Sequence, residues 1–563
     1  MVQELGKTTT AIEPMIARDI EKKYFFREIG KEMAFAALKS GIATLSVPYN
    51  NEYVNTNFNL NMLSVNSLKS TLFKEYMKNM VYFESSSETI YKNLGVTAIS
   101  PDFESTKHLL DVARNYSIPV NVIDPSNPIS IGLNPFAQDN VSQIATSISS
   151  VLRTMYLTTH TDAEETFMEN IAYQAIENLS ILLGVMYPKL NNGDLPNLED
   201  MLKMLNNFDL VEKMCEKLKE DPILSTKYDM QIGYFEKNFY KPRQDEKSYY
   251  GYSRADTERF VYSAITQLDN LLRHPGVKAV LCNRRNNVNF DIALANGEFT
   301  FACTRRGELG DATHKAFGMF IILLLQHAVL RRSGVEKSRI PHFLYIDEFP
   351  DFICKATEPL FTTYRKYRCG TIVTTQNLAQ LGGIDNKKEY KETIIANCNT
   401  KMVFGNATPE DIVFWETEFG KKRDWKMQFK YETNKFSYAP DLGNVEYYWK
   451  EYYKANQIQD RKFKALTYKT KDTKGKNIIG IGLTDFLEEK YKKSHECKTF
   501  GFDKYGVSTD KDSPSAEIKK ETNIKPTFKL EDTEDADPIV YNESSSASLF
   551  NGDGMIFNLK KKQ

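Results

Sequence analysis

Three residues near the start of the chain, Gly6-Lys7-Thr8, match the end of a phosphate-binding loop. The full pattern is Gly, four residues, Gly-Lys and then Ser or Thr, and its backbone N–H groups surround phosphate oxygens at the start of a helix. Lys7 would reach the β- and γ-phosphates, and Thr8 would bind Mg²⁺. Thr9 joins them as a candidate nucleotide contact. The first glycine of the pattern is missing, because counting back five positions from Gly6 reaches Met1.

A second candidate is the apolar run from His342 that ends in Asp347-Glu348. This is the Walker B form, in which a strand aims Asp347 at the water shell of Mg²⁺ and Glu348 polarises the attacking water. The alternative is a strand followed by an acidic turn. The β-like residues before the pair and Pro350 after it favour the role in catalysis.

A third candidate is Gln376, which ends a strand expected over residues 371–375. In a parallel sheet the carboxyl ends of the strands face the ligand crevice. A glutamine there can contact the γ-phosphate or orient water. Taken alone, a helix cap is the better interpretation. The order of the three candidates favours a nucleotide site, since Gln376 follows Asp347 by 29 residues.

The composition restricts where such chemistry can meet a partner. The 563 residues contain 73 Lys and Arg against 74 Asp and Glu, so contact with nucleic acid must be a local patch. Seven cysteines without C-x-x-C spacing indicate reduced thiols of a cytoplasmic chain, not disulfides or a zinc site. The most apolar run, residues 317–326, is about half the length of a membrane span and predicts a buried helix. We therefore expect no transmembrane segment in this chain.

Two parts of the chain, residues 1–136 and 276–424, alternate short apolar runs with helical patterns. This alternation predicts one α/β sheet that is divided in sequence, and the β-branched runs are typical of buried parallel strands. Expected strands lie at residues 41–47, 96–100, 120–124, 298–303, 342–347, 371–375 and 401–405. Expected helices lie at residues 104–116, 314–332 and 358–367.

The remaining parts have different patterns. Residues 137–275 show helical periodicity alone, which predicts an all-α insertion domain. Residues 425–500 predict a small β-rich extension that ends in a short helix at 485–491. Residues 501–563 are polar and include an acidic cluster, so they cannot bury enough apolar surface to order themselves. We expect a disordered tail there.

The order of these blocks resembles the TraG/TraD-type coupling proteins of type IV secretion and conjugation, within the FtsK/HerA group of RecA-like motor ATPases. The resemblance covers about residues 6–136 and 276–420. It is carried by the segments GKTTTAIEPMI, VTAISPD, IPVNVIDPSNPISIGLNPF, FLYIDEFPDF, YRKYRCGTIVTTQNLAQL and IIANCNTKMVFGNATPEDIVFWETEFG.

The resemblance implies a fold and a set of roles. It implies a RecA-like P-loop NTPase sheet that is split by an all-α insertion, with ATP and Mg²⁺ bound by the residues named above. It also implies a role for Arg365, in the Arg-Lys-aromatic stretch before the strand that ends at Gln376. This position resembles the family's arginine finger, whose charge meets the transferring phosphate across a subunit boundary.

The function implied is an ATP-driven DNA-translocating coupling ATPase of a conjugative type IV secretion system. Its expected partners are DNA phosphates bound without sequence specificity, a relaxase or accessory protein on the all-α domain, the secretion channel and further copies in a homo-hexamer. Two alternatives stay open. One is a degenerate, ATP-independent remnant that docks substrates, and the other is a related DNA packaging or segregation translocase.

Two departures from the family are visible. The family has a strand and G-x-x-x-x before its GKT, and it usually has N-terminal membrane helices that hold it at the inner face of the cell membrane. Neither feature is present in this sequence. We therefore expect an N-terminally truncated chain that binds ATP poorly as written.

Two basic clusters and one aromatic run are less specific. Arg284-Arg285 and residues 421–426 (KKRDWK) are expected to be solvated surface, with a DNA-facing loop as the alternative. Residues 446–454 (EYYWKEYYK) alternate polar and aromatic residues. We predict that these aromatic side chains pack in a core or sheet and do not stack on bases.

Overall fold

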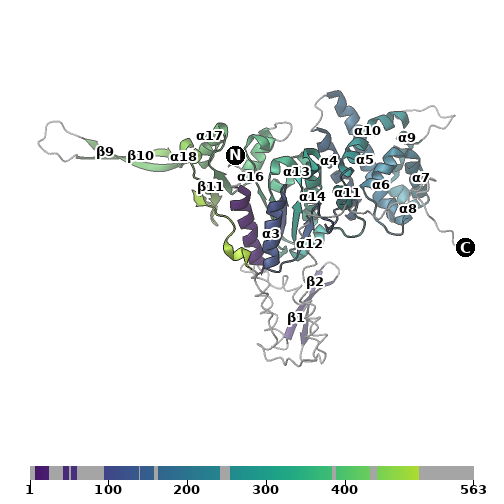
Figure 1. Cartoon of the computed structure of the whole chain (residues 1–563), viewed down its shortest axis with the longest axis horizontal. Helices are drawn as coiled ribbons and strands as arrows, with labels where there is room; N and C mark the ends of the chain where they lie inside the picture. Colours follow the sequence, from purple (N-terminus) through teal and green to yellow (C-terminus); the bar gives the residue numbers. More distant parts are fainter. Residues whose placement is uncertain are drawn as a thin grey trace, which may run out of the picture. The chain divides into compact units, whose positions relative to one another are not determined.

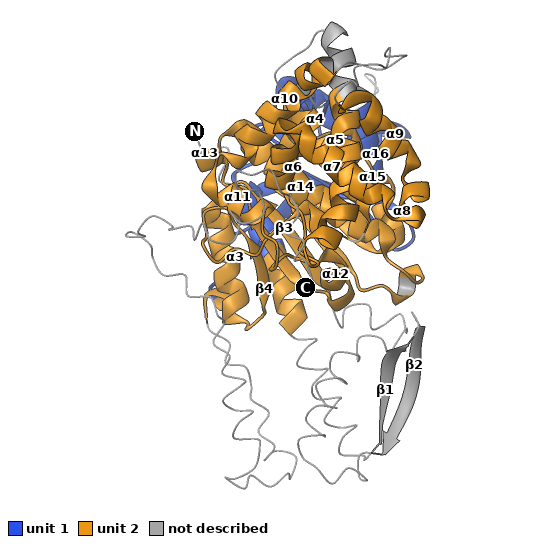
Figure 2. Ribbon diagram, turned by 90° about the vertical axis from the view of Figure 1, so that its right-hand side faces the viewer, with its two compact units in different colours: residues 1–15, 374–489 blue, residues 16–373, 490–563 orange. Residues whose placement is uncertain are grey.

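The computed structural model describes residues 7–24, 42–49, 52–59, 94–138, 140–157, 163–240, 254–382, 388–430 and 441–493 (Figure 1). The chain divides into two compact units, coloured in Figure 2. The smaller unit comprises residues 1–15 and 374–489, and the larger unit comprises residues 16–373 and 490–563. Each unit contains β-sheet of its own.

The larger unit is built on a five-stranded sheet in the order β4-β5-β3-β6-β7, and every strand pair in it is parallel. All residues of β3 and β5 are buried, as expected for parallel strands that are covered on both faces. Because the strands are parallel, their carboxyl ends share one edge of the sheet. The strands are β3 (Gly95–Ser100), β4 (Val120–Ile123), β5 (Phe299–Cys303), β6 (His342–Ile346) and β7 (Cys369–Val373).

Three helices pack near this sheet in the larger unit (Figure 1). Helix α3 (Phe103–Asn115) contacts β3 and β5, and α12 (Phe290–Asn296) contacts β3 and α14 (Asp311–Arg331). Among the described residues, α14 alone is long and apolar enough to cross a membrane. Most of its side chains are buried inside the unit, so it is a core helix here, as the sequence predicted.

Every described element between β4 and β5 is a helix. The first long one, α4 (Val141–Leu157), packs against α14, where Ser147 Oγ lies 3.1 Å from His327 Nδ1. The others are η5 (Pro135–Ala137), α5 (Ala163–Leu190), α6 (Leu198–Asn206), α7 (Phe208–Lys219), α8 (Pro222–Lys227), α9 (Asp229–Asn238), α10 (Arg254–Leu272), α11 (Pro275–Leu281) and α12.

The predicted helix after the GKT motif is present over residues 7–24, with a π-helical turn, η1, at Thr8–Ile12. Pro14 lies two positions after this turn. In a regular α-helix a proline ring clashes with the carbonyl four residues earlier, and a π-bulge is one way to relieve such a clash. The wider turn therefore accounts for how a helix continues through Pro14. Ile16 and Ala17 beyond it are buried.

The smaller unit holds a three-stranded antiparallel sheet, β12-β11-β8, and a separate two-stranded ribbon, β9–β10. Its core includes the buried side chains of Val403, Ile412, Phe419 and Ile458. The strands are β8 (Lys401–Phe404), β9 (Lys421–Lys430), β10 (Asp441–Glu451), β11 (Ala465–Lys471) and β12 (Asn477–Leu483). Its helices include α16 (Lys388–Asn397), α17 (Pro409–Phe419) and α18 (Ala455–Gln459).

The predicted fold class, an α/β sheet divided in sequence by a helical segment, is confirmed. Two strands were assigned to the wrong sheet. The strand expected at 401–405 is β8, which pairs with β11, and the strand expected at 41–47 is β1 (Ile42–Tyr49), which pairs with β2 (Glu52–Asn59) in a separate hairpin. Both segments have strand composition, but composition does not select the partner strand.

The helix expected over residues 358–367 is interrupted. The structure has α15 (Pro359–Thr362) and then the 3-10 helix η9 (Tyr364–Tyr367), separated by Thr363 with φ −120°. The expected short helix at 485–491 is the 3-10 helix η11 (Glu489–Lys492). The tail expected at 501–563 lies outside the described residues.

His342 at the start of β6 gives the larger unit a titratable group in its core. It is 1% exposed, and its Nε2 lies 2.9 Å from Thr97 Oγ1. Burial, assisted by the charges of Arg332 and Lys23, lowers the pKa of His342 to about 3. An unfolded histidine binds its proton near pH 6.5, so between pH 6.5 and 3 the unfolded state binds more protons than the native state. The free energy of unfolding is therefore unaffected by His342 above pH 6.5. As the pH decreases through this window, the free energy of unfolding falls by up to about 1.4 kcal/mol per pH unit.

Replacing His342 with Asn should remove this pH dependence. We expect the free energy of unfolding, measured with urea at pH 7 and pH 5, to fall less for His342→Asn than for the wild type. His108→Asn on the exposed side of α3 is the control and should keep the wild-type dependence. Equal slopes for His342→Asn and the wild type would show that another group causes the acid sensitivity.

Candidate functional site

Asp347 and Glu348 follow the last residue of β6, at the carboxyl edge of the parallel sheet. The N–H of Asp347 donates to the carbonyl of Ile99 at 3.0 Å, which continues the pairing with β3, and the Asp347 residue is 7% exposed. Glu348 has φ +52°, a left-handed conformation that costs a residue other than glycine on the order of 1–3 kcal/mol. Such strain clusters at functional sites, because the surrounding structure has to enforce it.

Arg306, three positions after the last residue of β5, holds the Glu348 side chain. Its Nη1 donates to Glu348 Oε2 at 2.7 Å and to Asp351 Oδ2 at 3.1 Å. Buried His314 of α14 lies with Nε2 3.2 Å from the same Asp351 oxygen. Burial would raise the pKa of Asp351, but the hydrogen bond with His314 and the charges of Arg306 and Lys315 outweigh it and hold that pKa below its usual value. The acidic turn therefore has a fixed position and a cation beside it.

Arg305 joins the ends of β4 and β5. Its Nε and Nη2 donate to the two carboxylate oxygens of Asp124 at 2.9 and 2.8 Å, and its guanidinium lies 4.0 Å from the ring centre of Phe103. The Asp124 side chain is 1% exposed, so this is a buried, bidentate pair. Arg305 has φ +47°, so the turn after β5, like the turn after β6, has a left-handed residue.

Four residues at the carboxyl edge of the parallel sheet were not predicted from the sequence: Asp124, Arg305, Arg306 and Asp351. A signal for two of them was present. Asp124 is the last residue of the strand expected at 120–124, and Arg305 comes two positions after the strand expected at 298–303. The rule that pointed to Asp347, that polar residues at the carboxyl ends of parallel strands share one edge, applies to both.

In the smaller unit the structure brings Lys7 to the segment that contains Gln376. Lys7 Nζ donates to the Thr375 carbonyl at 2.8 Å and lies 3.4 Å from the carbonyl oxygen of Gln376. The N–H of Leu378 donates to buried Asp411 at 3.0 Å, which fixes this segment to the start of α17. Two of the predicted site residues therefore lie side by side, although they are 369 positions apart.

The other predicted residues are divided between the units. Thr8 and Thr9 belong to the smaller unit with Lys7 and Gln376, whereas Asp347, Glu348 and Arg365 belong to the larger unit. Gly6 lies outside the described residues.

Arg365 is not near the acidic pair of its own chain. It is exposed on η9, before the first residue of β7, whereas Asp347 follows the last residue of β6. Because β6 and β7 pair in parallel, the two residues are at opposite edges of the sheet. Five strand residues separate these edges by about 16 Å. Any contact of Arg365 with phosphate would involve a different copy of the acidic pair.

The residue types fit a nucleotide with Mg²⁺. The Thr8 hydroxyl and the Asp347 carboxylate supply oxygen atoms, the ligands that Mg²⁺ prefers, and Lys7 already donates to two backbone oxygens. Among the described residues there is no group of three or more His, Cys, Asp or Glu that could hold a metal ion. This agrees with the usual binding of Mg²⁺, which keeps waters and phosphate oxygens and takes few protein ligands.

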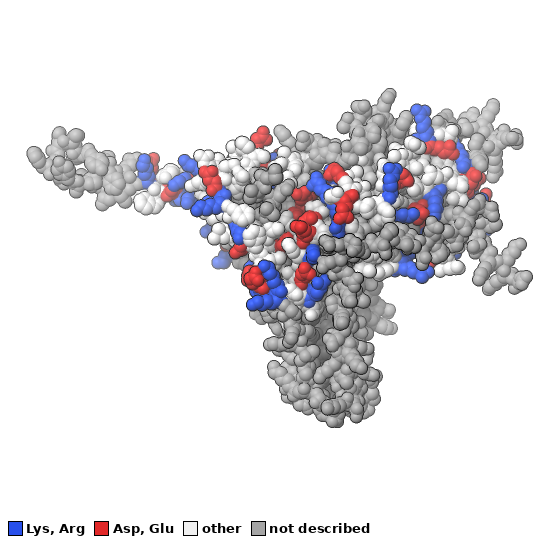
Figure 3. All heavy atoms as spheres, viewed as in Figure 1, with Lys and Arg blue, Asp and Glu red and all other residues white. Residues whose placement is uncertain are grey.

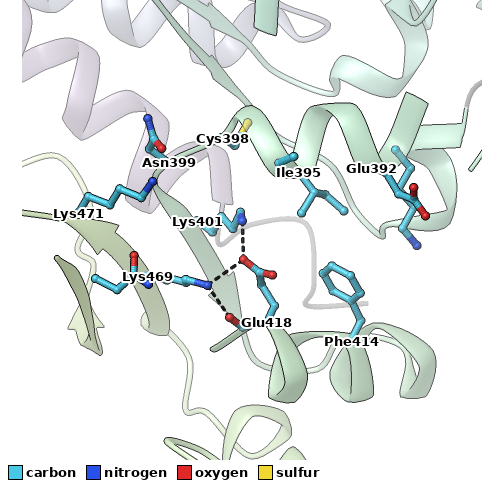
Figure 4. A pocket seen from close by; sticks show the side chains of 12 residues that line it. Glu392, Ile395, Cys398, Asn399, Lys401, Phe414, Glu418, Lys469 and Lys471 are labelled. Atoms are coloured by element: carbon cyan, nitrogen blue, oxygen red, sulfur yellow. Dashed lines mark hydrogen bonds and ion pairs between the residues drawn. The ribbon is translucent and has the colours of Figure 1, made fainter. Parts of the chain in front are cut away.

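A pocket of about 590 Å³ in the smaller unit was not predicted (Figure 4). On one side, Glu418 accepts from Lys401 at 2.5 Å and from Lys469 at 3.0 Å. Burial would raise the pKa of Glu418, but these two lysines outweigh it and lower that pKa. The pocket is separate from the Lys7 contacts. Its lining residues are Lys391, Glu392, Ile395, Ala396, Cys398, Asn399, Lys401, Phe414, Glu418, Lys469, Lys471 and Asn477.

One of the two basic clusters has a structural role. Arg284 donates to Asp200, whose side chain is 1% exposed, at 2.7 Å and lies 5.2 Å from the ring centre of Tyr187. The expectation of a solvated side chain was therefore wrong for Arg284. Its neighbour Arg285 is exposed, as expected.

Residues 341–458 match the family model described as the TraM recognition site of TraD and TraG. Over these residues the chain is similar to TraD and TraG. The match includes β6, the acidic turn, Arg365, Gln376 and the ribbon β9–β10, so the resemblance based on the motifs is confirmed. A comparison with curated proteins found no match.

Solved structures of coupling proteins resemble this chain remotely. TrwBdeltaN70, a bacterial conjugative coupling protein, is 12% identical, with a TM-score of 0.45 over 70% of this chain and 85% of its own. The plasmid coupling protein TrwB in complex with ADP and Mg²⁺ is 11% identical, with a TM-score of 0.45 over the same shares. VirB4 of Thermoanaerobacter pseudethanolicus is 12% identical, with a TM-score of 0.34 over 71% of this chain and 83% of its own. The fold described above is based on the strand order and register of this chain.

Proposed function

We propose that the chain is an ATP-driven DNA-translocating coupling ATPase of a conjugative type IV secretion system, which links a relaxase–DNA substrate to the transfer channel. The observation that carries this proposal is the acidic turn Asp347-Glu348 at the carboxyl edge of the parallel sheet. Its strained Glu348 and the adjacent Arg306 form the kind of arrangement that activates water beside a phosphate. The family match over the same residues supports it.

In this proposal Lys7 exchanges its backbone partners for the β- and γ-phosphates, and Gln376 beside it contacts the γ-phosphate. Thr8 and Asp347 hold Mg²⁺, which offsets the negative charge of the phosphates when bound. Glu348 accepts a proton from the attacking water, and Arg306 keeps its carboxylate in place. These are roles of orientation and charge, which supply most of the catalysis in phosphoryl transfer.

Assembly is part of the same proposal. Because Arg365 lies at the opposite edge of the sheet from the acidic pair, it would complete the site of a neighbouring copy in a homo-hexamer. DNA would be held by its phosphates without sequence specificity. A relaxase or accessory protein would dock on the helical segment, and in the cell the complex would meet the channel at the inner face of the membrane.

Lys7→Ala tests the nucleotide part directly. Losing one charge-assisted contact of about 1.5–3 kcal/mol should weaken the binding of Mg²⁺–ATP about tenfold to a hundredfold. Lys22→Ala is the matched control, since Lys22 lies on the same helix, has a side chain that is 40% exposed and pairs with Asp19. Calorimetry gives the affinities, and a coupled assay with and without DNA gives the turnover. Equal nucleotide affinity for the two variants, with no turnover that DNA stimulates, would favour an ATP-independent docking protein.

A further inference from the structure

The ribbon β9–β10 places unlike side chains on its two faces. In its antiparallel register Arg423 lies opposite Trp449, and Trp425 lies opposite Tyr447. Side chains alternate along each strand, so these four project from one face. The residues between them, which include Lys422, Asp424, Tyr448 and Lys450, project from the other face.

The aromatic face of the ribbon, formed by Arg423, Trp425, Tyr447 and Trp449, is exposed. Trp425 is 58% exposed, Tyr447 is 59% exposed and Trp449 is 68% exposed. Arg423 lies 4.3 Å from the ring centre of Tyr447 and is exposed as well. The prediction that the aromatic residues of the 446–454 run pack in a core or sheet was therefore wrong for Tyr447, Tyr448 and Trp449. Alternation indicates a strand, but it does not show that a second layer covers it.

Such a surface is unusual for an unpartnered ribbon. Two antiparallel strands alone are marginally stable in water, and exposed clusters of large apolar side chains mark interaction sites. In Figure 1 the ribbon extends from α17 and α18 of the smaller unit. Among the residues that the structure describes, more than half of the surface of Trp425, Tyr447 and Trp449 is left uncovered, so a ligand can contact this face.

Charge indicates what kind of ligand fits. Residues 421–426 and 445–451 of the ribbon include five cations and three acids. The cations are Lys421, Lys422, Arg423, Lys426 and Lys450, and the acids are Asp424, Glu446 and Glu451. Two of the acids are paired inside the ribbon, Asp424 with Lys450 and Glu451 with Lys421. The ribbon therefore keeps a net positive charge, although the whole chain has a net charge of −1. Figure 3 shows Lys and Arg gathered with few acids along its described part.

We propose that the aromatic face of the ribbon binds single-stranded nucleic acid. Bases would stack on Trp425, Tyr447 and Trp449, and the cations of the ribbon would meet the phosphates. Every base has an aromatic face, so such a surface binds without sequence preference, and positive charge along it follows the backbone. The proposal deepens the proposed function, because it names the surface that holds the DNA and the strand form that this surface prefers.

The test measures binding of a fluorescein-labelled oligothymidine of about 15 nucleotides by anisotropy, without ATP. The double variant Trp425→Leu/Trp449→Leu should bind at least about tenfold more weakly, since stacking is worth about 1–3 kcal/mol per base. Trp425→Phe/Trp449→Phe retains aromatic faces and should bind within a few-fold of the wild type. Tyr262→Leu on α10, an equally exposed ring at 69%, is the matched control and should change nothing.

The salt dependence gives a second readout. Replacing Lys421 and Arg423, which alternate onto the aromatic face, with Gln should reduce the slope of log affinity against log salt by about 0.7 for each phosphate contact that is lost. Wild-type affinity of the leucine double variant for the oligothymidine would overturn the proposal. If the oligomeric state of that variant also changed, the aromatic face would be a contact with a second copy of the chain. Preference for duplex DNA of the same length would overturn it as well. Because no step needs ATP turnover, failure here is distinct from failure of the ATPase proposal.

Discussion

Replacing Glu348 with Gln should lower Mg²⁺-dependent ATP hydrolysis by about 10²–10⁴-fold, the usual contribution of a general base. The amide keeps the size of the side chain and can still contact Arg306, but it cannot accept a proton from water. Nucleotide affinity should stay near the wild-type value, because Glu348 is not expected to contact ATP in its ground state. Steady-state turnover and calorimetric binding of ATP, measured on the same preparations, separate the two effects.

Glu308→Gln is the control for this prediction. Glu308 lies on α13 (Arg306–Leu309), which follows the end of β5. It pairs with Arg305 at 2.8 Å, and its side chain is 50% exposed. Removing its charge should leave turnover within about twofold, since exposed pairs contribute only about 0–1 kcal/mol. Equal turnover in Glu348→Gln and the wild type would contradict the assignment of the acidic turn. Such a result would favour a protein that docks substrates without hydrolysing ATP.

Replacing Arg305 with Met should lower the free energy of unfolding of the larger unit by about 3–5 kcal/mol, because a buried charge loses its partner. Asp124, whose side chain is 1% exposed, would keep one backbone donor, the N–H of Ser126 at 3.0 Å, in place of the two bonds from the guanidinium. Methionine fills similar space over Phe103, so the loss should come mainly from the unpaired carboxylate. Urea unfolding followed by far-UV circular dichroism measures it.

The adjacent Arg306 supplies the comparison. Its side chain is 45% exposed and pairs with Glu348 and Asp351, so Arg306→Met should cost about 1 kcal/mol or less. The double variant Asp124→Asn/Arg305→Met should recover part of the loss, because the pair is then removed together. Equal destabilisation by Arg305→Met and Arg306→Met would show that the buried pair does not hold the ends of β4 and β5 together.

The parallel sheet could largely be predicted, because its strands are short, apolar and separated by helical patterns. The strand ending in Asp347 was placed to within one residue. The last strand was expected at 371–375 and lies at Cys369–Val373, since Cys369-Gly370 does not look like the start of a strand. Strand partners were harder to predict: 401–405 has the same β-branched character but joins an antiparallel sheet in the smaller unit.

The candidate site was only partly predictable for a related reason. Motif spacing selected Lys7, Asp347 and Gln376 as candidates, because the roles in such motifs are tied to fixed positions near a strand or helix end. Arg306 reaches the same edge from the first residue of α13 and Asp351 from a 3-10 helix, where position depends on the backbone conformation of the preceding turn. The left-handed φ of Arg305 and Glu348 has no residue-type signal, because glycine is the usual choice there.

The packing of α14 against α4 has a consequence for how the chain can be divided. Helix α4 is the first long helix of the helical segment, and α14 follows that segment in sequence. The two helices contact each other, with Ser147 Oγ of α4 3.1 Å from His327 Nδ1 of α14. A fragment with residues 137–275 alone would leave that surface of α4 open to water. The helical segment therefore shares part of its core with α14, which follows β5. During synthesis the chain has to extend to the end of α14 before this part of the core can form.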